Sequence, residues 1–164
     1  MYRNFLKLKK SKQGTGNGVF TDIDIPAESP IMEMTGNVYT KETMPEPNHP
    51  ALLQVSNKYF IGPSGTIDDY VNHSCDPNCY LHIVGKRAIL YSLYFIREGS
   101  ELTFDYSTTS TETMEEWSME CFCKSFKCRK IISGYQYLPE SLKKEYENKG
   151  MIPMYICNPY FKRI

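Results

Sequence analysis

The chain has 164 residues, of which 41% are hydrophobic and 13% aromatic, so its composition is that of a folded globular protein rather than a disordered one. This length fits one domain with a moderate core and a small appendage. Nineteen basic residues balance nineteen acidic ones, so no overall field attracts nucleic acid or a membrane surface. The apolar residues among the N-terminal lysines are too few for a signal peptide, and no apolar run could span a bilayer.

Six cysteines without a secretory signal predict a reducing compartment, where thiols serve metal binding or catalysis more often than disulfides. We therefore expect the cytoplasm if the chain is bacterial, and the nucleus if it is eukaryotic or delivered to a host. No membrane location is expected.

A strand and a glycine-rich turn are predicted near the N-terminus. Residues 5–9 alternate, with Leu6 and Leu8 on one side, which is typical of a half-buried strand. Residues 14–18 hold three glycines and lead into a second apolar strand. Such a loop allows close backbone approach to a ligand. A hairpin turn is the simpler interpretation, because Pro26 and Pro30 interrupt any βαβ pattern.

The next stretch is predicted to be a strand followed by a variable insert. Residues 31–36 indicate a strand that ends at a glycine, and residues 41–50 hold three prolines in a polar run typical of a loop. Residues 52–55 and 59–61 are short strand or helix fragments, closed by a turn at residues 62–65.

Residues 72–79 read Asn-His-Ser-Cys-Asp-Pro-Asn-Cys, and nearly every side chain in this segment is a metal ligand, a hydrogen-bonding group or a turn former. The Asp-Pro-Asn sequence predicts a tight turn, because proline fixes φ. A polar surface loop is the plain alternative for the segment taken alone.

The clearest strands follow. Residues 80–84 and 87–95 flank Gly85-Lys86, the spacing of a β-hairpin with a short loop. A further strand is predicted at residues 101–106, where Phe104 and Tyr106 lie on one phase and are expected to pack in the core. Many short strands joined by turns predict a mostly β domain with little helix.

The C-terminal part has a different character. Residues 112–119 are compatible with a helix, and Cys121, Cys123 and Cys128 follow at a spacing typical of a zinc site. The fourth ligand stays open among five candidates: His73, Cys75, Cys79, His82 and Cys157. After Pro139 a short helix is predicted with Leu142 and Tyr146 on one face, ending near residue 150 before an apolar terminus at 151–161.

These signals coincide in an order that resembles the SET-domain protein-lysine methyltransferases with a C-terminal post-SET zinc element. The resemblance spans about residues 5–130, and the compact layout looks like the small stand-alone SET proteins of bacteria. It rests on five motifs: Gly-Asn-Gly-Val-Phe at 16–20, Glu-Met-Thr-Gly at 33–36, the segment 72–78, Glu-Leu-Thr-Phe-Asp-Tyr at 101–106, and Cys-x-Cys-x4-Cys at 121–128.

The resemblance implies a SET fold, in which small curved β-sheets form and the segments around Asn72 and Tyr106 thread into a pseudoknot. The SET domain would cover residues 1–109, with a variable insert at about 41–65. Residues 110–164 would form the post-SET zinc element and a C-terminal extension with a helix. Cofactor and peptide would bind on opposite faces.

The same resemblance implies two cofactors. S-adenosylmethionine would be bound by Gly16, Asn17, Gly18, Val19, Phe20, Asn72, His73, Tyr106 and Phe122. One structural zinc ion would be bound by Cys75, Cys121, Cys123 and Cys128. Cys79 and Cys157 would then lie outside the metal site, and we expect both to be buried in apolar packing.

The implied reaction is transfer of a methyl group to a protein lysine, with Tyr106 as the catalytic residue and Phe104, Met34 and Tyr70 in the lysine channel. Phe104 stands where the family has Phe or Tyr, and Phe leaves room for di- or trimethylation. Met34 departs from the common Glu-Tyr-x-Gly motif, so a channel tyrosine is missing. Tyr39, Tyr59 and Tyr70 are candidates to replace it.

Two other functions are weighed against this one. A catalytically weak SET module that binds a protein partner is favoured only by Met34. A zinc-binding nucleic-acid module is disfavoured by the zero net charge, and no direct nucleic-acid binding is expected. The basic residues of the zinc loop are expected to solvate it or to contact an acidic substrate flank: Lys124, Lys127, Arg129 and Lys130. The expected substrate is a histone tail or another basic protein; the oligomeric state is not encoded.

Overall fold

The computed structural model describes residues 1–14, 16–44, 49, 51–111 and 117–158. Its strands are β1 Leu6–Lys10, β2 Asn17–Thr21, β3 Pro30–Met34, β4 Val38–Tyr39, β5 Leu53–Gln54, β6 Phe60–Ile61, β7 Asn72–His73, β8 Cys79–Val84, β9 Arg87–Ser92, β10 Thr103–Phe104, β11 Ser118–Glu120 and β12 Ile131–Ser133. Its helices are α1 Glu140–Asn148 and α2 Met154–Cys157, with short 3-10 turns η1 Arg3–Phe5, η2 Ile67–Tyr70, η3 Tyr106–Thr108 and η4 Tyr135–Tyr137.

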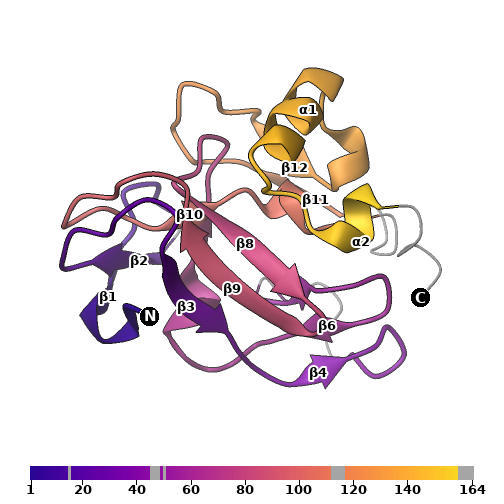
Figure 1. Cartoon of the computed structure of the whole chain (residues 1–164), viewed down its shortest axis with the longest axis horizontal. Coiled ribbons are helices and arrows are strands. Elements are labelled where there is room, and N and C mark those ends of the chain that lie inside the picture. Colours follow the sequence, from indigo (N-terminus) through magenta and orange to yellow (C-terminus); the bar gives the residue numbers. More distant parts are fainter. Residues whose placement is uncertain (15, 45–48, 50, 112–116, 159–164) are drawn as a thin grey trace.

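The described strands form several small sheets, which confirms the mostly β fold with few helices. The antiparallel sheet β3-β9-β8 lies at the centre of the molecule (Figure 1). The hairpin of β8 and β9 pairs in register from Cys79 opposite Ser92 to Val84 opposite Arg87, as the Gly85-Lys86 turn predicts. The fragments in the insert are strands, because β5 and β4 flank β6 in a second sheet.

The N-terminal strand is confirmed, but the burial expected from its alternation is wrong. β1 pairs with β2 as an antiparallel hairpin, so Gly14 and Gly16 lie in the hairpin loop and Asn17 and Gly18 begin β2. Leu6 is buried, whereas Leu8 is 43% exposed and the three lysines of β1 are exposed as well. The two-stranded sheet lies at the edge of the molecule (Figure 1), so only one end of β1 contacts the core.

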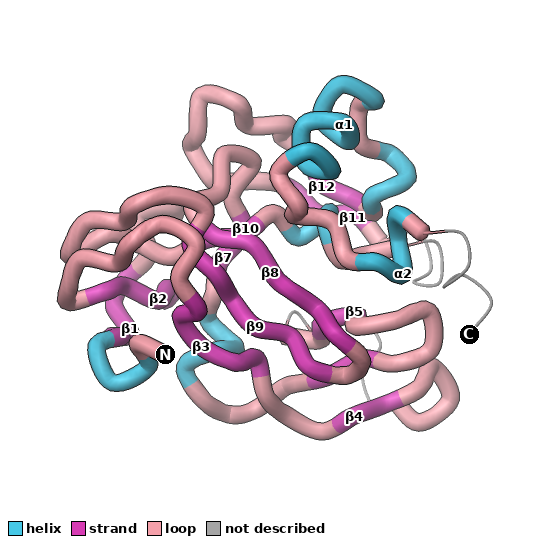
Figure 2. Tube along the Cα trace, in the orientation of Figure 1, coloured by secondary structure: helices cyan, strands magenta, loops and turns pink. Residues whose placement is uncertain are grey.

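Two segments distant in sequence are joined by the parallel pairing of β7 with β10, in which Asn72 lies opposite Thr103 and His73 opposite Phe104. The side chain of Asn78 strengthens this crossing, since its Nδ2 donates to the carbonyl of Glu101 and its Oδ1 accepts from the N–H of Thr103. The chain at 72–78 thus holds the chain at 101–104 by two separate contacts. Figure 2 shows β7 and β10 together beside the central sheet.

The strand predicted at residues 101–106 is shorter in the structure. β10 contains only two residues, and Tyr106 begins the 3-10 turn η3. The cause is local, because the carboxylate of Asp105 accepts from the N–H of Ser107 and caps that turn. Tyr106 is therefore turned out of the sheet.

The core is one large cluster with a smaller one around the zinc motif. The large cluster includes residues from the central sheet and from the C-terminal extension, such as Leu81, Leu90, Tyr146, Met151 and Tyr155. The smaller one consists of Cys75, Cys121 and Ile132. The division between residues 109 and 110 stays a prediction.

The C-terminal expectations have mixed outcomes. α1 follows Pro139 and buries Tyr146, with Leu142 packed against the core, as predicted. The helix predicted at 112–119 is wrong at its C-terminal end, because residues 118–120 form strand β11, which pairs with β12. Residues 112–116 of this prediction lie outside the described residues. Cys79 is fully buried as expected, but Cys157 is exposed, because α2 buries Tyr155 and Ile156 instead.

The described residues include no helix with both the length and the apolarity needed to cross a bilayer. A buried hydroxyl attaches the described part of the C-terminal extension to the rest of the fold. Tyr155 donates toward the carbonyl oxygens of Gln54 and Thr109, at 3.0 and 2.6 Å. This contact ties α2 to β5 and to the residues that follow η3.

Replacing Tyr155 by phenylalanine should lower the free energy of unfolding by about 1–3 kcal/mol, because the buried carbonyl oxygens of Gln54 and Thr109 lose the hydroxyl hydrogen that they share. Urea titration followed by circular dichroism measures the change. Tyr137→Phe is the matched control, since this ring is 61% exposed. Equal stability of the two variants would contradict the attachment.

Candidate active site and metal centre

A cleft of about 660 Å³ gathers residues from both crossing segments and from the zinc motif. Its volume lies in the range of small-molecule and cofactor sites, about 300–1,000 Å³. Seven of the site residues predicted from the sequence line it: Met34, Asn72, His73, Phe104, Tyr106, Cys121 and Phe122. The structure adds further lining residues that the sequence did not indicate, including Asp69, Thr109, Trp117 and Glu120.

The remaining predicted site residues do not line this cleft. Tyr70 is 42% exposed at the end of η2. Val19 and Phe20 are buried, at 0% and 4% exposure, so their side chains belong to the interior. The start of β2 lies near the cleft through its backbone, because the carbonyl of Asn17 accepts from Nδ2 of Asn72 at 3.0 Å.

Tyr106 is fixed by a hydrogen bond and by ring contacts. Its hydroxyl donates to the carbonyl of Val71 at 2.8 Å. Its ring centroid lies 4.8 Å from that of Phe104 and 5.3 Å from that of His73. Burial raises the pKa of Tyr106 above its ordinary value. The phenol is therefore a protonated donor at neutral pH, and its oxygen keeps lone pairs to accept a further hydrogen bond.

Asn72 is oriented by Glu101, a residue whose role the sequence did not reveal. Both hydrogens of the Asn72 amide are used, one toward Asn17 and one toward Oε1 of Glu101 at 2.8 Å. The carboxylate also accepts from the hydroxyl of Ser11 at 3.1 Å. Because the amide nitrogen is occupied, the group that Asn72 offers to a ligand is its oxygen.

The close packing around Glu101 explains why the residue at position 18 is a glycine. A Cβ at this position would lie 2.2 Å from Oε1 of Glu101 and 2.9 Å from Nδ2 of Asn72. Any larger side chain would displace the pair. The glycine-rich motif thus serves a close approach between its backbone and the Asn72 side chain, in addition to the hairpin turn.

Four side chains beside the cleft could hold a metal ion. The donor atoms of His73, Cys75, Cys121 and Cys123 all lie within 4.8 Å of one another. The sulfur atoms of Cys75 and Cys121 are 3.7 Å apart. Tetrahedral zinc with zinc–sulfur bonds of about 2.3 Å requires sulfur separations of about 3.8 Å. The donor types and this separation therefore fit zinc.

The positions of the candidate residues in the structure bear on which of them is the fourth zinc ligand. Cys128 packs against the small cluster, and its sulfur lies 3.6 Å from the carbonyl oxygen of Cys121. Within the described residues, Cys79, His82, Cys128 and Cys157 are not part of the donor group. The structure therefore brings His73 to the sulfurs of Cys75, Cys121 and Cys123, whereas ligation by Cys128, which packs beside them, stays a prediction.

A bound cation would change the protonation of these thiols. Burial raises the pKa of Cys75 to about 11, so the thiol stays protonated at neutral pH unless a metal ion replaces its proton. Burial likewise lowers the pKa of His73 to about 4, with Asp105 opposing the shift. The imidazole is therefore neutral at neutral pH.

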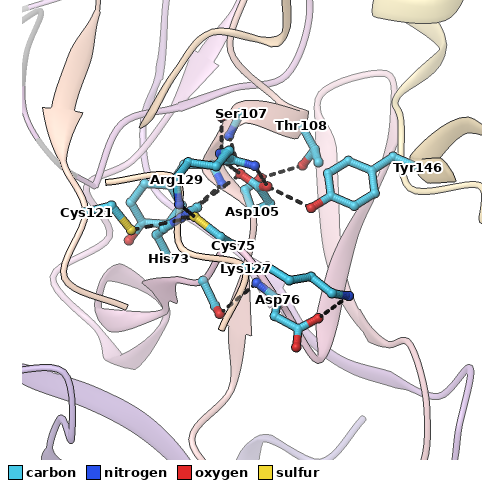
Figure 3. Close-up of polar contacts among 12 residues, drawn as sticks. His73, Cys75, Asp76, Asp105, Ser107, Thr108, Cys121, Lys127, Arg129 and Tyr146 are labelled. Carbon is cyan, nitrogen blue, oxygen red and sulfur yellow. Dashed lines mark hydrogen bonds and ion pairs between the residues drawn. The ribbon is translucent and has the colours of Figure 1, made fainter. Parts of the chain in front are cut away.

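Asp105 connects this centre to the rest of the fold (Figure 3). Its carboxylate is fully buried and accepts two hydrogen bonds from Arg129, at 2.5 and 2.8 Å. The hydroxyl of Tyr146 donates to it at 2.9 Å, and Nδ1 of His73 lies 3.5 Å away. The expectation that Arg129 solvates the zinc loop or contacts a substrate is wrong, because this side chain is only 17% exposed and pairs internally.

Two other basic residues of the zinc loop, Lys124 and Lys127, also contact the protein itself. Lys127 forms an ion pair with Asp76 at 2.9 Å, and Nζ of Lys124 donates to the carbonyl of Lys12. Both lysines are exposed, so they contribute little to stability. Their contacts join the zinc loop to the segment at 72–79 and to the N-terminal hairpin.

Comparison with known proteins gives relatives for most of the chain. Ash1 of Drosophila melanogaster, a histone-lysine N-methyltransferase, is 31% identical over 133 residues, which are 73% of this chain and 6% of ash1. The H3 lysine-36 specific histone-lysine N-methyltransferase of Chaetomium globosum is 27% identical over 148 residues, 81% of this chain and 16% of that protein. The chain thus spans only a small part of these relatives.

Solved structures show the same fold. The structure of KRYPTONITE in complex with mCHG DNA and SAH superposes with a TM-score of 0.63 at 24% identity, covering 77% of this chain and 28% of that chain. A second KRYPTONITE structure, with mCHH DNA, H3(1-15) peptide and SAH, gives a TM-score of 0.62 at 24% identity. Residues 16–107, more than half of the chain, match the SET domain family. The crossed segments β7 and β10 lie within this match. The chain therefore belongs to the SET-domain family.

Proposed function

We propose that this protein transfers a methyl group from S-adenosylmethionine to a lysine side chain of another protein. The observation that carries the proposal is the single cleft in which Asn72, His73, Phe104 and Tyr106 meet beside a cluster of metal-binding side chains. The named relatives are histone-lysine N-methyltransferases. The related KRYPTONITE structures contain SAH, the demethylated form of the same cofactor.

The cofactor would supply an activated methyl carbon bonded to a positive sulfur, and the protein's part is to position the acceptor. A free lysine has a pKa of about 10.4, so about one in 2,500 is neutral at pH 7. The largely apolar cleft disfavours the ammonium form of a bound lysine and lowers its pKa. The hydroxyl of Tyr106 donates a hydrogen bond to the carbonyl of Val71. Its oxygen therefore accepts a hydrogen bond from the substrate amine and orients the amine.

Phe104 and Met34 supply the apolar walls of the proposed lysine channel. Phe104 is 6% exposed and lies against Tyr106. It carries no hydroxyl that would hold a water near the amine, so we propose that di- or trimethyl-lysine is the product. Aromatic rings also attract methylated ammonium groups by cation–π interaction. Met34 lines the cleft where many family members have a tyrosine.

The charge of the cleft supports a basic substrate such as a histone tail. Its lining contains the acidic residues Asp69 and Glu120, and none of the described lining residues is lysine or arginine. A peptide with positive flanking residues is therefore attracted to it. A histone substrate would place the protein at chromatin.

Zinc is proposed to bind Cys75, Cys121, Cys123 and Cys128, beside the residues that bind the cofactor. Its role is structural, because a site with four protein ligands has no open position for substrate. Phe122, between two of these ligands, lines the cleft and is 55% exposed. Metal binding would thus fix one wall of the cofactor site.

Replacing Tyr106 by phenylalanine should reduce methyl transfer about 100-fold, because one preorganised hydrogen-bonding group is lost. The measurement is incorporation of labelled methyl into core histones. The exposed Tyr137→Phe variant should keep full activity. Equal labelling by the wild-type protein and the Tyr106 variant would refute the assigned role. Binding of a histone peptide without labelling by either protein would support the catalytically weak module instead.

The product should depend on the residue at position 104. A Phe104→Tyr variant adds a hydroxyl next to Tyr106, and we expect a shift toward monomethyl-lysine. Mass spectrometry of the methylated peptide resolves the three products. Phe95→Tyr tests the same substitution on a ring that is 55% exposed. An unchanged product distribution would show that Phe104 does not limit methylation.

Glu101→Gln should weaken cofactor binding, because the charged acceptor of the Asn72 amide is replaced by a neutral one. A loss of about 1.4 kcal/mol corresponds to a tenfold higher dissociation constant for S-adenosylhomocysteine, measured by calorimetry. Glu98→Gln serves as control at an exposed position in the preceding turn. Identical dissociation constants for both variants would mean that Glu101 does not position Asn72.

A further inference from the structure

The hydrogen bonds of His73 determine which ring nitrogen carries a proton. The backbone N–H of Tyr106 points at Nδ1, with a nitrogen separation of 3.2 Å. A nitrogen that accepts a hydrogen bond has a free lone pair, so Nδ1 carries no hydrogen. The hydrogen of the imidazole is therefore on Nε2.

Nε2 in turn faces a cysteine sulfur. It lies 3.2 Å from Sγ of Cys75, which also accepts from the backbone N–H of Arg129 at 3.4 Å. Two N–H donors directed at one sulfur are suited to a thiolate, the form that binds a metal ion. An Nε2 that carries hydrogen has no lone pair for the metal, so Cys128 is left as the fourth ligand.

We propose that His73 is a positioning residue that couples the metal centre to the catalytic tyrosine. Its Nε2–H donates to the Cys75 thiolate, and its Nδ1 accepts from the backbone of Tyr106. The inference rests on the proposed function of Tyr106, and it assigns to the His73 side chain a task separate from cofactor contact.

The surroundings of the ring favour this arrangement over metal ligation by His73. The competing arrangement would place the hydrogen on Nδ1, where it would point to Oδ1 of Asp105 at 3.5 Å. That carboxylate already accepts from Arg129, Tyr146 and the N–H of Ser107. The N–H of Tyr106 would then lose its acceptor. His73 is 6% exposed, so water would not easily replace it.

The coupling has a structural consequence for the active site. Tyr106 is held at its hydroxyl by Val71 and at its backbone by His73. Movement of Cys75 shifts the imidazole and then the peptide unit of Tyr106. Metal loss is therefore expected to disturb the catalytic residue directly, in addition to loosening the zinc loop.

The first experiment measures the histidine in the wild-type protein, loaded with cadmium-113 in place of zinc and labelled with nitrogen-15. We expect the His73 ring to show hydrogen on Nε2 and no scalar coupling of either nitrogen to cadmium. We also expect a chemical shift of cadmium typical of four sulfur ligands. A direct cadmium–nitrogen coupling to His73 would overturn the proposal.

The second experiment compares His73→Gln with His82→Gln, the same substitution on an exposed histidine of β8 outside the donor group. Loss of a hydrogen bond to a metal ligand lowers metal affinity about 10- to 100-fold. Competition with a chelator should show this for His73→Gln alone, and the amide resonance of Tyr106 should shift in that variant. Equal zinc affinity in the two variants would overturn the coupling.

Both experiments are independent of methyl transfer. Should His73→Gln fail to fold, the cadmium measurement on the wild-type protein still decides the question. If the coupling is found but no substrate is methylated, the proposed function fails while the link between His73, Cys75 and Tyr106 stands.

Discussion

The buried carboxylate of Asp105 is the constraint on which the rest of the site depends. A fully buried charge is costly unless it is paired and hydrogen-bonded, and here Arg129, Tyr146 and Ser107 all donate to it. Its donors come from the zinc loop, from α1 and from η3 (Figure 3). Removal of Arg129 would leave the buried charge unpaired, and removal of the Tyr146 hydroxyl would take one hydrogen bond from it. One residue of the SET segment therefore holds the cysteine-rich loop that contains Arg129 and the helix α1 in place.

The second constraint is the crossing of the two motif segments. Only two residue pairs join β7 to β10, too few to be stable alone. Asn78 adds two hydrogen bonds to the backbone of the other segment, and Glu101 holds Asn72. Residues that line the cleft and residues that support them thus lie in the same short stretches. This explains why two segments with so little regular structure can supply four of the predicted residues that line the cleft: Asn72, His73, Phe104 and Tyr106.

Local sequence patterns predicted much of the fold correctly. The β8–β9 hairpin, the N-terminal hairpin and α1 follow from turn residues and from periodicity, which act between neighbours in the chain. Most errors lie where contacts with distant parts of the chain, rather than neighbouring residues, decide the local structure. Leu8 is exposed because β1 lies at the edge of the molecule. The strand that ends before Tyr106 is the exception, because its cause, the cap of η3 by Asp105, is local. Residues 118–120 form a strand because β12 pairs with them.

The sequence by itself determined the chemical groups of this protein: the glycine-rich loop, the Asn-His pair, the clustered cysteines and the Phe-x-Tyr motif. Only the tertiary structure decided how they are used. It brought Cys75 to Cys121, paired Arg129 with Asp105, and oriented Asn72 through Glu101. The partners in these contacts are separated by 46, 24 and 29 residues. Residue types encode which bonds are possible, whereas packing over such separations selects the bonds that form.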